Sequence, residues 1–194
     1  MKKITALFLL LSLIAPVQAL EIAGVKLADK VRVEENELVL NGAVIRTNIF
    51  VKSYIVVLYL GEKTSSGEVV LADAGAKRVA LHILRNMEAQ RFVGIFEKAV
   101  TANHSPIEMA ALAERVRKFS RLLDQSSLPD GMIWGKGDVI DFDYLPAVGT
   151  RVSVNGVEKG RVEGVEFYRA MLKAWLGDKP LNEDVKKGLL DAAQ

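Results

Sequence analysis

The stretch IFVKSYIVVLYL, residues 49–60, decides the fold of this 194-residue chain. It is rich in β-branched and aromatic residues and holds neither glycine nor proline, which is typical of a strand. Toward its C-terminal end both alternating faces are apolar, as Val56 and Val57 illustrate. A strand that is apolar on both faces is covered on both sides of its sheet. Residues 49–60 therefore predict a central strand.

Further strands are predicted on either side of this stretch. Asn41-Gly42 is either a tight hairpin or a bulge, because both residues tolerate positive φ. Asn155-Gly156 and Lys159-Gly160 bracket a later hairpin. The predicted strands before and after the central one cover residues 30–33, 38–40, 44–47, 77–84, 139–145, 150–154 and 160–165.

Helices are predicted where the apolar period changes from two to about 3.6 residues. Phe92, Ile95, Phe96 and Ala99 follow the spacing i, i+3, i+4, i+7. Ser105-Pro106, with Glu108 as the third helical residue, has the pattern of a capped helix start. The predicted helices cover residues 88–102, 105–123, 166–176 and 182–190. The alternation predicts an α+β domain in which a large antiparallel sheet is covered by helices on one face.

Residues 1–19, MKKITALFLLLSLIAPVQA, have the features of a secretory signal peptide. Lys2 and Lys3 form the positive segment, an apolar run follows, and Val17-Gln18-Ala19 places small residues at the cleavage positions. The apolar run is shorter than the roughly 20 residues that span a bilayer. We therefore expect a mature domain of residues 20–194 in the periplasm or outside the cell.

The composition excludes several classes of protein. The leader holds two of the 26 basic residues and none of the 24 acidic ones, so residues 20–194 balance at 24 against 24. A formally neutral chain is not expected to bind nucleic acid, and residues 20–194 contain no predicted transmembrane segment. With no cysteine in the sequence, disulfides, thiolate metal sites and a cysteine nucleophile are excluded.

The usual patterns of catalytic and metal sites are missing, so we predict no catalytic residue, no metal site and no cofactor. The two histidines, His82 and His104, do not have a metal-ligand spacing, and no G-x-S-x-G motif occurs. Asp141 and Asp143 share one strand face without an EF-hand glycine or glutamate. We interpret them as part of a solvated strand face.

Arg46 is the strongest candidate for ligand binding. It lies in a predicted strand just before the most apolar one. An arginine turned into the covered face of a sheet needs an anion, because an unpaired buried charge is very costly. Its fork of donors fits a carboxylate, and Tyr59 could add a hydroxyl to the same anion. Alternatively, Arg46 pairs with an internal acid or points to water.

Two motifs give the chain a family resemblance. The run NGAVIRTNIFVKSYIVVLYLGEK, residues 41–63, resembles the core of the chalcone isomerase superfamily, with its N-G-x(3)-R-x(3)-F-V-K-x-Y-x(3)-L-Y-L pattern. The tail GVEFYRAMLKAWLGDKP is similar to the closing helix of the bacterial chalcone isomerase-like group. Together with KRVALHILRN the resemblance covers nearly all of residues 20–194. It implies an open-faced β-sandwich, a large antiparallel sheet layered with helices.

On function, the resemblance points in two directions. Plant chalcone isomerases cyclise a chalcone with an arginine, a strand threonine, a lysine and a tyrosine. In this chain Arg46 matches the arginine, but Tyr54 stands at the position of the threonine. Residues 88–105, where the family's helical tyrosine is expected, contain no tyrosine. Other members bind fatty acids without catalysis, and an arginine with a tyrosine thirteen residues later holds the carboxylate at the end of an apolar tunnel. Arg46 and Tyr59 have that spacing.

Three hypotheses follow. The first is an exported, non-enzymatic binding protein for a fatty acid or similar amphiphilic carboxylate, held by Arg46 and Tyr59. The second is an isomerase or lyase on an aromatic or enone substrate, and the third is a protein that kept the fold and no ligand. In the first, methylene burial at about 0.8 kcal/mol each supplies most of the affinity. The apolar helix residues are interpreted as ordinary core rather than as sites: Phe92, Phe96, Met171 and Trp175.

Overall fold

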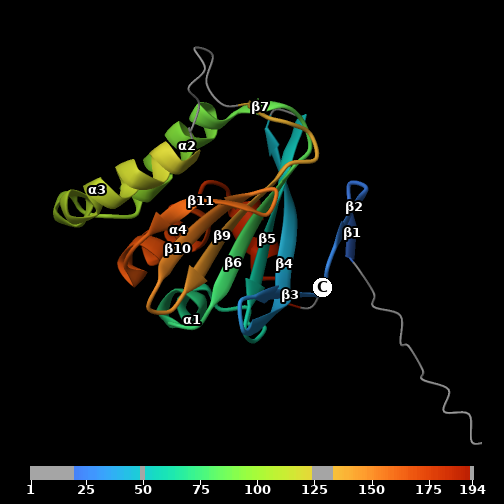
Figure 1. Cartoon of the computed structure of the whole chain (residues 1–194), viewed down its shortest axis with the longest axis horizontal. Helices are drawn as coiled ribbons and strands as arrows, with labels where there is room; N and C mark the ends of the chain where they lie inside the picture. The colour runs from blue at the N-terminus through green and yellow to red at the C-terminus, as the bar shows by residue number, and fades with distance from the viewer. Residues whose placement is uncertain (1–19, 49–50, 124–132, 193–194) are drawn as a thin grey trace, which may run out of the picture.

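The computed structural model describes residues 20–48, 51–123 and 133–192. The predicted signal peptide, residues 1–19, lies outside them. Seven strands form one antiparallel sheet in the order β11-β10-β9-β6-β5-β4-β3, which Figure 1 shows as a curled layer. Its strands are β3 (Lys30–Val33), β4 (Asn36–Asn48), β5 (Val51–Leu60), β6 (Lys77–Ile83), β9 (Val139–Leu145), β10 (Gly149–Val154) and β11 (Val157–Val162).

The remaining elements of the described residues are five helices and two small ribbons. One ribbon pairs β1 with β2 and the other pairs β7 with β8. None of the helices in the described ranges has the length and apolarity needed to cross a membrane. The bounds are α1 (Gly67–Ala72), α2 (Ala89–Ala102), α3 (Pro106–Leu123), α4 (Val165–Leu176), α5 (Glu183–Leu189), β1 (Leu20–Ile22), β2 (Val25–Leu27), β7 (Met87–Glu88) and β8 (Ile133–Trp134).

The sheet separates two apolar clusters. Tyr54, Val56 and Leu58 of β5 point into the larger one, which the helices cover. Ile55 and Val57 point the other way, into a smaller cluster that includes Leu27 and Val33 of the N-terminal strands. β5 is therefore buried on both faces, and the predicted α+β architecture with helices on one face is confirmed.

Local signals in the sequence explain several boundaries. Ser105 and Glu108 form the predicted reciprocal cap: the Ser105 backbone N–H donates to Glu108 Oε2 at 2.7 Å, and the Glu108 N–H donates to Ser105 Oγ at 3.3 Å. Asn41-Gly42 is a bulge rather than a hairpin, because the pairing of β4 with β5 shifts between Leu40 and Gly42. The short helix α1, which begins at Gly67, is not among the helices predicted from the sequence.

Two glycines let α5 rest directly on β4. A Cβ on Gly42 would collide with the carbonyl oxygen of Gly188 and lie 2.6 Å from Leu189 O. Asn41 fixes the same contact, since its Nδ2 donates to Leu189 O at 2.7 Å and its Oδ1 accepts from the Thr64 N–H at 2.8 Å. The C-terminal helix is therefore held to the sheet through the backbone.

We expect Gly42→Ala to lower the free energy of unfolding by about 1–3 kcal/mol, because the added methyl meets backbone that must shift. Gly61→Ala is the matched control: a Cβ there meets nothing within 4 Å. Urea unfolding of both variants measures the difference. Equal stabilities of the two variants would contradict the close contact between α5 and β4.

Candidate functional site

Arg46 lies near the end of β4, directly opposite Tyr54 on β5. Tyr54 is in turn opposite Ile83 on β6. Residues opposite one another in an antiparallel pair share a face, so Arg46 lies on the helix-covered side of the sheet. The Arg46 side chain is half-buried, and its Nη1 donates to the backbone oxygen of Thr47. Within the described residues, no carboxylate forms an ion pair with Arg46.

The structure does not bring Tyr59 to Arg46. Tyr59 is opposite Leu40 and Arg78 and packs in the smaller cluster, while Tyr54 packs in the larger one. Five residues of strand separate the two tyrosines, about 17 Å, and the odd number places them on opposite faces. The register of the β4–β5 pair explains this separation. Asn48, the last residue of β4, lies opposite Val51, the first residue of β5, so Arg46 lies opposite Tyr54 and not Tyr59.

A cavity of about 100 Å³ opens beside Arg46. Its wall combines residues of β4 and β5 with residues from the β6–β7 connection and the start of α2. Ile95 on this wall is 43% exposed, so the cavity opens to solvent past an apolar side chain. The lining residues are Arg46, Ser53, Tyr54, Arg85, Met87, Arg91 and Ile95. Sequence reasoning missed Arg85 and Arg91, which are distant from Arg46 in the chain and carry no motif.

Both tyrosines are held in the protonated form at neutral pH. Burial raises the pKa of Tyr54 to about 12, and the nearby Arg46 charge opposes the rise. Burial also raises the pKa of Tyr59 to about 12; Arg78 opposes that rise, and Asp141 and Asp29 add to it. Tyr54 is therefore a phenol that can donate a hydrogen bond into the cavity beside Arg46.

Aromatic rings fill the space between the cavity and the centre of the core. The Phe92 ring meets Tyr54 edge-on at 6.0 Å between centroids and Trp134 at 5.2 Å. Phe96 and Trp175 continue the layer at 5.7 Å from each other. Phe92, Phe96, Met171 and Trp175 are all at most 2% exposed, which confirms that these residues are core.

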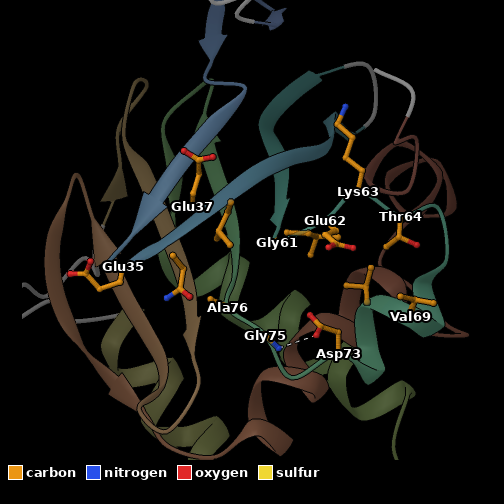
Figure 2. Close-up of a pocket in the computed structure, with 14 residues that line it drawn as sticks. Glu35, Glu37, Gly61, Glu62, Lys63, Thr64, Val69, Asp73, Gly75 and Ala76 are labelled. Carbon is orange, nitrogen blue, oxygen red and sulfur yellow. Dashed lines mark hydrogen bonds between the residues drawn. The ribbon is translucent and has the colours of Figure 1, made fainter.

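A much larger cavity, about 820 Å³, lies at the opposite end of β5, where Leu60 lines it. Figure 2 shows the carboxylates that surround it, from Glu35, Glu37, Glu62 and Asp73. Glu37 is bound by Lys30 at 2.7 Å, and Asp73 is bound by Lys77 at 2.7 Å. None of its lining residues is an arginine, and its carboxylates outnumber its one lysine, Lys63, so size does not make it the better candidate for a carboxylate ligand.

The acidic residues of β9 are not on a solvated strand face, and that prediction was wrong. Asp143 is 1% exposed and accepts from Arg78 Nε at 2.5 Å, Arg78 Nη2 at 2.8 Å and Arg151 Nη2 at 2.8 Å. Asp141 lies on the same face, 3.7 Å from Arg78 Nε. Arg78 of β6 and Arg151 of β10, the strands on either side of β9, thus share one buried carboxylate. No group of three or more possible metal ligands occurs in the described part of the chain.

Comparisons with known proteins agree with this geometry at the level of the fold. The family model described as chalcone isomerase-like matches residues 19–191. Among solved structures, the chain is similar to the crystal structure of a fatty-acid binding protein from Arabidopsis thaliana, with a TM-score of 0.70 and 14% sequence identity. The likeness covers 91% of this chain and 97% of the plant protein. Among curated proteins, none matches.

Proposed function

Because this chain belongs to the chalcone isomerase-like family, we propose that it is an exported binding protein for a fatty acid or a similar amphiphilic carboxylate. The observation that carries the proposal is the half-buried Arg46, which lines a cavity beside a protonated tyrosine and pairs with no carboxylate of the described residues. An unpaired cation in such a place favours an anionic ligand. The plant protein of similar fold, named for fatty-acid binding, supports the class of ligand.

We assign the head group to Arg46 and Tyr54. The guanidinium supplies charge and a fork of donors, and the Tyr54 hydroxyl supplies one neutral donor. Since the Tyr54 pKa is about 12, its proton stays in place at neutral pH. The same pKa disfavours either tyrosine as a general base near neutrality, one of the roles that the isomerase alternative could require.

The acyl tail requires a movement of the protein. The cavity of about 100 Å³ is smaller than the roughly 300–1,000 Å³ of common ligand pockets. Phe92 of α2 blocks the way inward by packing on Tyr54 and Trp134. We propose that α2 shifts outward when the tail enters, so that the ring of Phe92 leaves Trp134. Lipid binding should then change the fluorescence of Trp134.

Export is proposed from the sequence of residues 1–19, which reads as a cleavable leader. The ligand would then be encountered in the periplasm or outside the cell.

Native mass spectrometry of the protein, expressed from the 194-residue chain and purified without detergent, tests both the export and the binding proposal. We expect an intact mass that lacks residues 1–19 and a bound mass equal to a fatty acid. An uncleaved protein found only in the cytoplasm would contradict export. A protein that carries no lipid and also fails to take up added oleate would contradict the binding function, and turnover in a screen of enone substrates would support the isomerase instead.

A matched pair of tyrosine variants distinguishes the two possible head-group partners. We expect Tyr54→Phe to weaken oleate binding about 3- to 10-fold, the value of one hydrogen bond. Tyr59→Phe should leave the affinity unchanged, because Tyr59 faces the other side of the sheet. Titration followed by tryptophan fluorescence measures both. The reverse result would restore the pair Arg46 and Tyr59 predicted from spacing.

A further inference from the structure

The cavity beside Arg46 contains more positive charge than one carboxylate can match. Arg46, Arg85 and Arg91 line it together with Ser53 and Tyr54, and no acidic residue is among its lining residues. The three arginines come from three separate parts of the chain: β4, the connection between β6 and β7, and the first turn of α2. The fold therefore brings three guanidinium groups to one small opening.

These charges lack partners in the described part of the chain. Arg85 and Arg91 are exposed and form no ion pair there, and neither does Arg46. By contrast, Arg78 and Arg151 share the carboxylate of Asp143. Like charges gathered without an anion repel one another, so this arrangement favours a ligand that brings negative charge.

The start of α2 adds to the positive electrostatic potential at this cavity. A cation in the first turn of a helix opposes the helix dipole, yet Arg91 occupies that turn. The first turn of α2 holds no acidic residue, and its N-cap Glu88 makes no side-chain hydrogen bond to the helix. An anion in the cavity would offset the charge of Arg91 as well as that of Arg46.

We propose that the preferred head group of this site is a phosphate monoester attached to an acyl chain. A phosphate monoester carries about −1.5 to −2 charge at pH 7 and three acceptor oxygens, which match three guanidinium groups better than a single carboxylate does. Met87 and Ile95 on the same wall supply apolar surface for the lipid. Ile133 (58% exposed) adds to it from an adjoining cavity, which Glu88 also lines. The inference rests on the proposed lipid-binding function and narrows its ligand.

Four probes separate the head group from the acyl chain: oleate, 1-oleoyl lysophosphatidate, glycerol 3-phosphate and inorganic phosphate. Each is titrated into the purified protein, the two lipids below their micelle concentrations. We expect the lysophosphatidate to bind at least 10-fold more tightly than oleate, with the difference shrinking as salt is raised. Glycerol 3-phosphate and inorganic phosphate should bind far more weakly than the lysophosphatidate, because they lack the acyl chain.

The double variant Arg85→Gln/Arg91→Gln should remove the preference. We expect its lysophosphatidate affinity to fall at least 10-fold and its oleate affinity to fall less than 3-fold. Arg117→Gln/Arg121→Gln on α3 is the matched control, since it changes the net charge equally at two exposed positions away from this cavity. Both pairs of residues are exposed, so thermal melting should show folded protein in each case.

The outcomes separate this inference from the proposed function. Equal affinities for oleate and the lysophosphatidate would overturn the phosphate preference and leave a fatty-acid binding protein. If glycerol 3-phosphate bound as tightly as the lysophosphatidate, the proposal of a lipid ligand would be overturned, and the ligand would be a soluble phosphate ester. Binding of neither lipid would overturn both proposals.

Discussion

Arg46→Gln should weaken oleate binding roughly 10- to 100-fold. Glutamine keeps much of the length and hydrogen-bonding capacity of arginine but removes its charge. A hydrogen bond to a charged group contributes about 1.5–3 kcal/mol, and each 1.4 kcal/mol changes affinity tenfold. The effect should be large because Arg46 is half-buried beside the buried Tyr54, where water screens the charge less than at the surface.

Arg32→Gln is the matched control, because Arg32 is an exposed strand arginine on β3 and lines neither the cavity beside Arg46 nor the larger, mainly acidic one. Calorimetric titration of oleate into both variants and the unaltered protein gives the comparison, with circular dichroism to verify the fold. Undiminished binding in a folded Arg46→Gln protein would show that the anion is held elsewhere. If Arg32→Gln lost as much oleate affinity as Arg46→Gln, the effect would come from the net charge of the protein and not from the position of Arg46.

The fold could be predicted because its decisive signals are local. The doubly apolar run that became β5 identifies a covered central strand, and Ser105 with Glu108 identifies a helix start through hydrogen bonds three residues apart. The short helix α1 was missed because only one of its six residues, Val70, is buried. A segment so short gives too little apolar periodicity to detect.

The candidate site could be predicted only in part, because it depends on register and on distant segments. Arg46 was chosen from its place before the apolar strand, and its role in anion binding stays a prediction. The pairing with Tyr59 does not hold in the structure. A tyrosine thirteen residues later lies opposite Arg46 only if the chain turns near residues 52–53, whereas β5 already begins at Val51. Arg85 reaches the cavity from the connection between β6 and β7, and Arg91 reaches it from the first turn of α2. Their spacing in the sequence does not indicate that they lie close to Arg46.

Replacing Asp143 or Asp141 of β9 by asparagine should have different effects on the free energy of unfolding. Asp143→Asn leaves Arg78 and Arg151 without the carboxylate that they share. Removing one partner of a buried ion pair costs about 3–5 kcal/mol, and we expect about 3 kcal/mol because both arginine side chains keep 18% exposure. For a chain of this size the melting temperature should fall by roughly 6–12 °C.

Asp141→Asn should leave the free energy of unfolding at pH 7 unchanged or raise it. Burial raises the pKa of Asp141, since Arg78 compensates only part of the lost hydration and Asp143 adds repulsion. A carboxyl whose pKa is higher in the folded state destabilises that state as pH rises through the raised pKa. Asparagine removes this penalty, so the stability of the variant relative to the unaltered protein should increase from acid to neutral pH. Urea unfolding at pH 4 and pH 7 measures the change. If both variants lost about 3 kcal/mol at pH 7, the two carboxylates would act as one charge network, and Asp143 would not be its single centre.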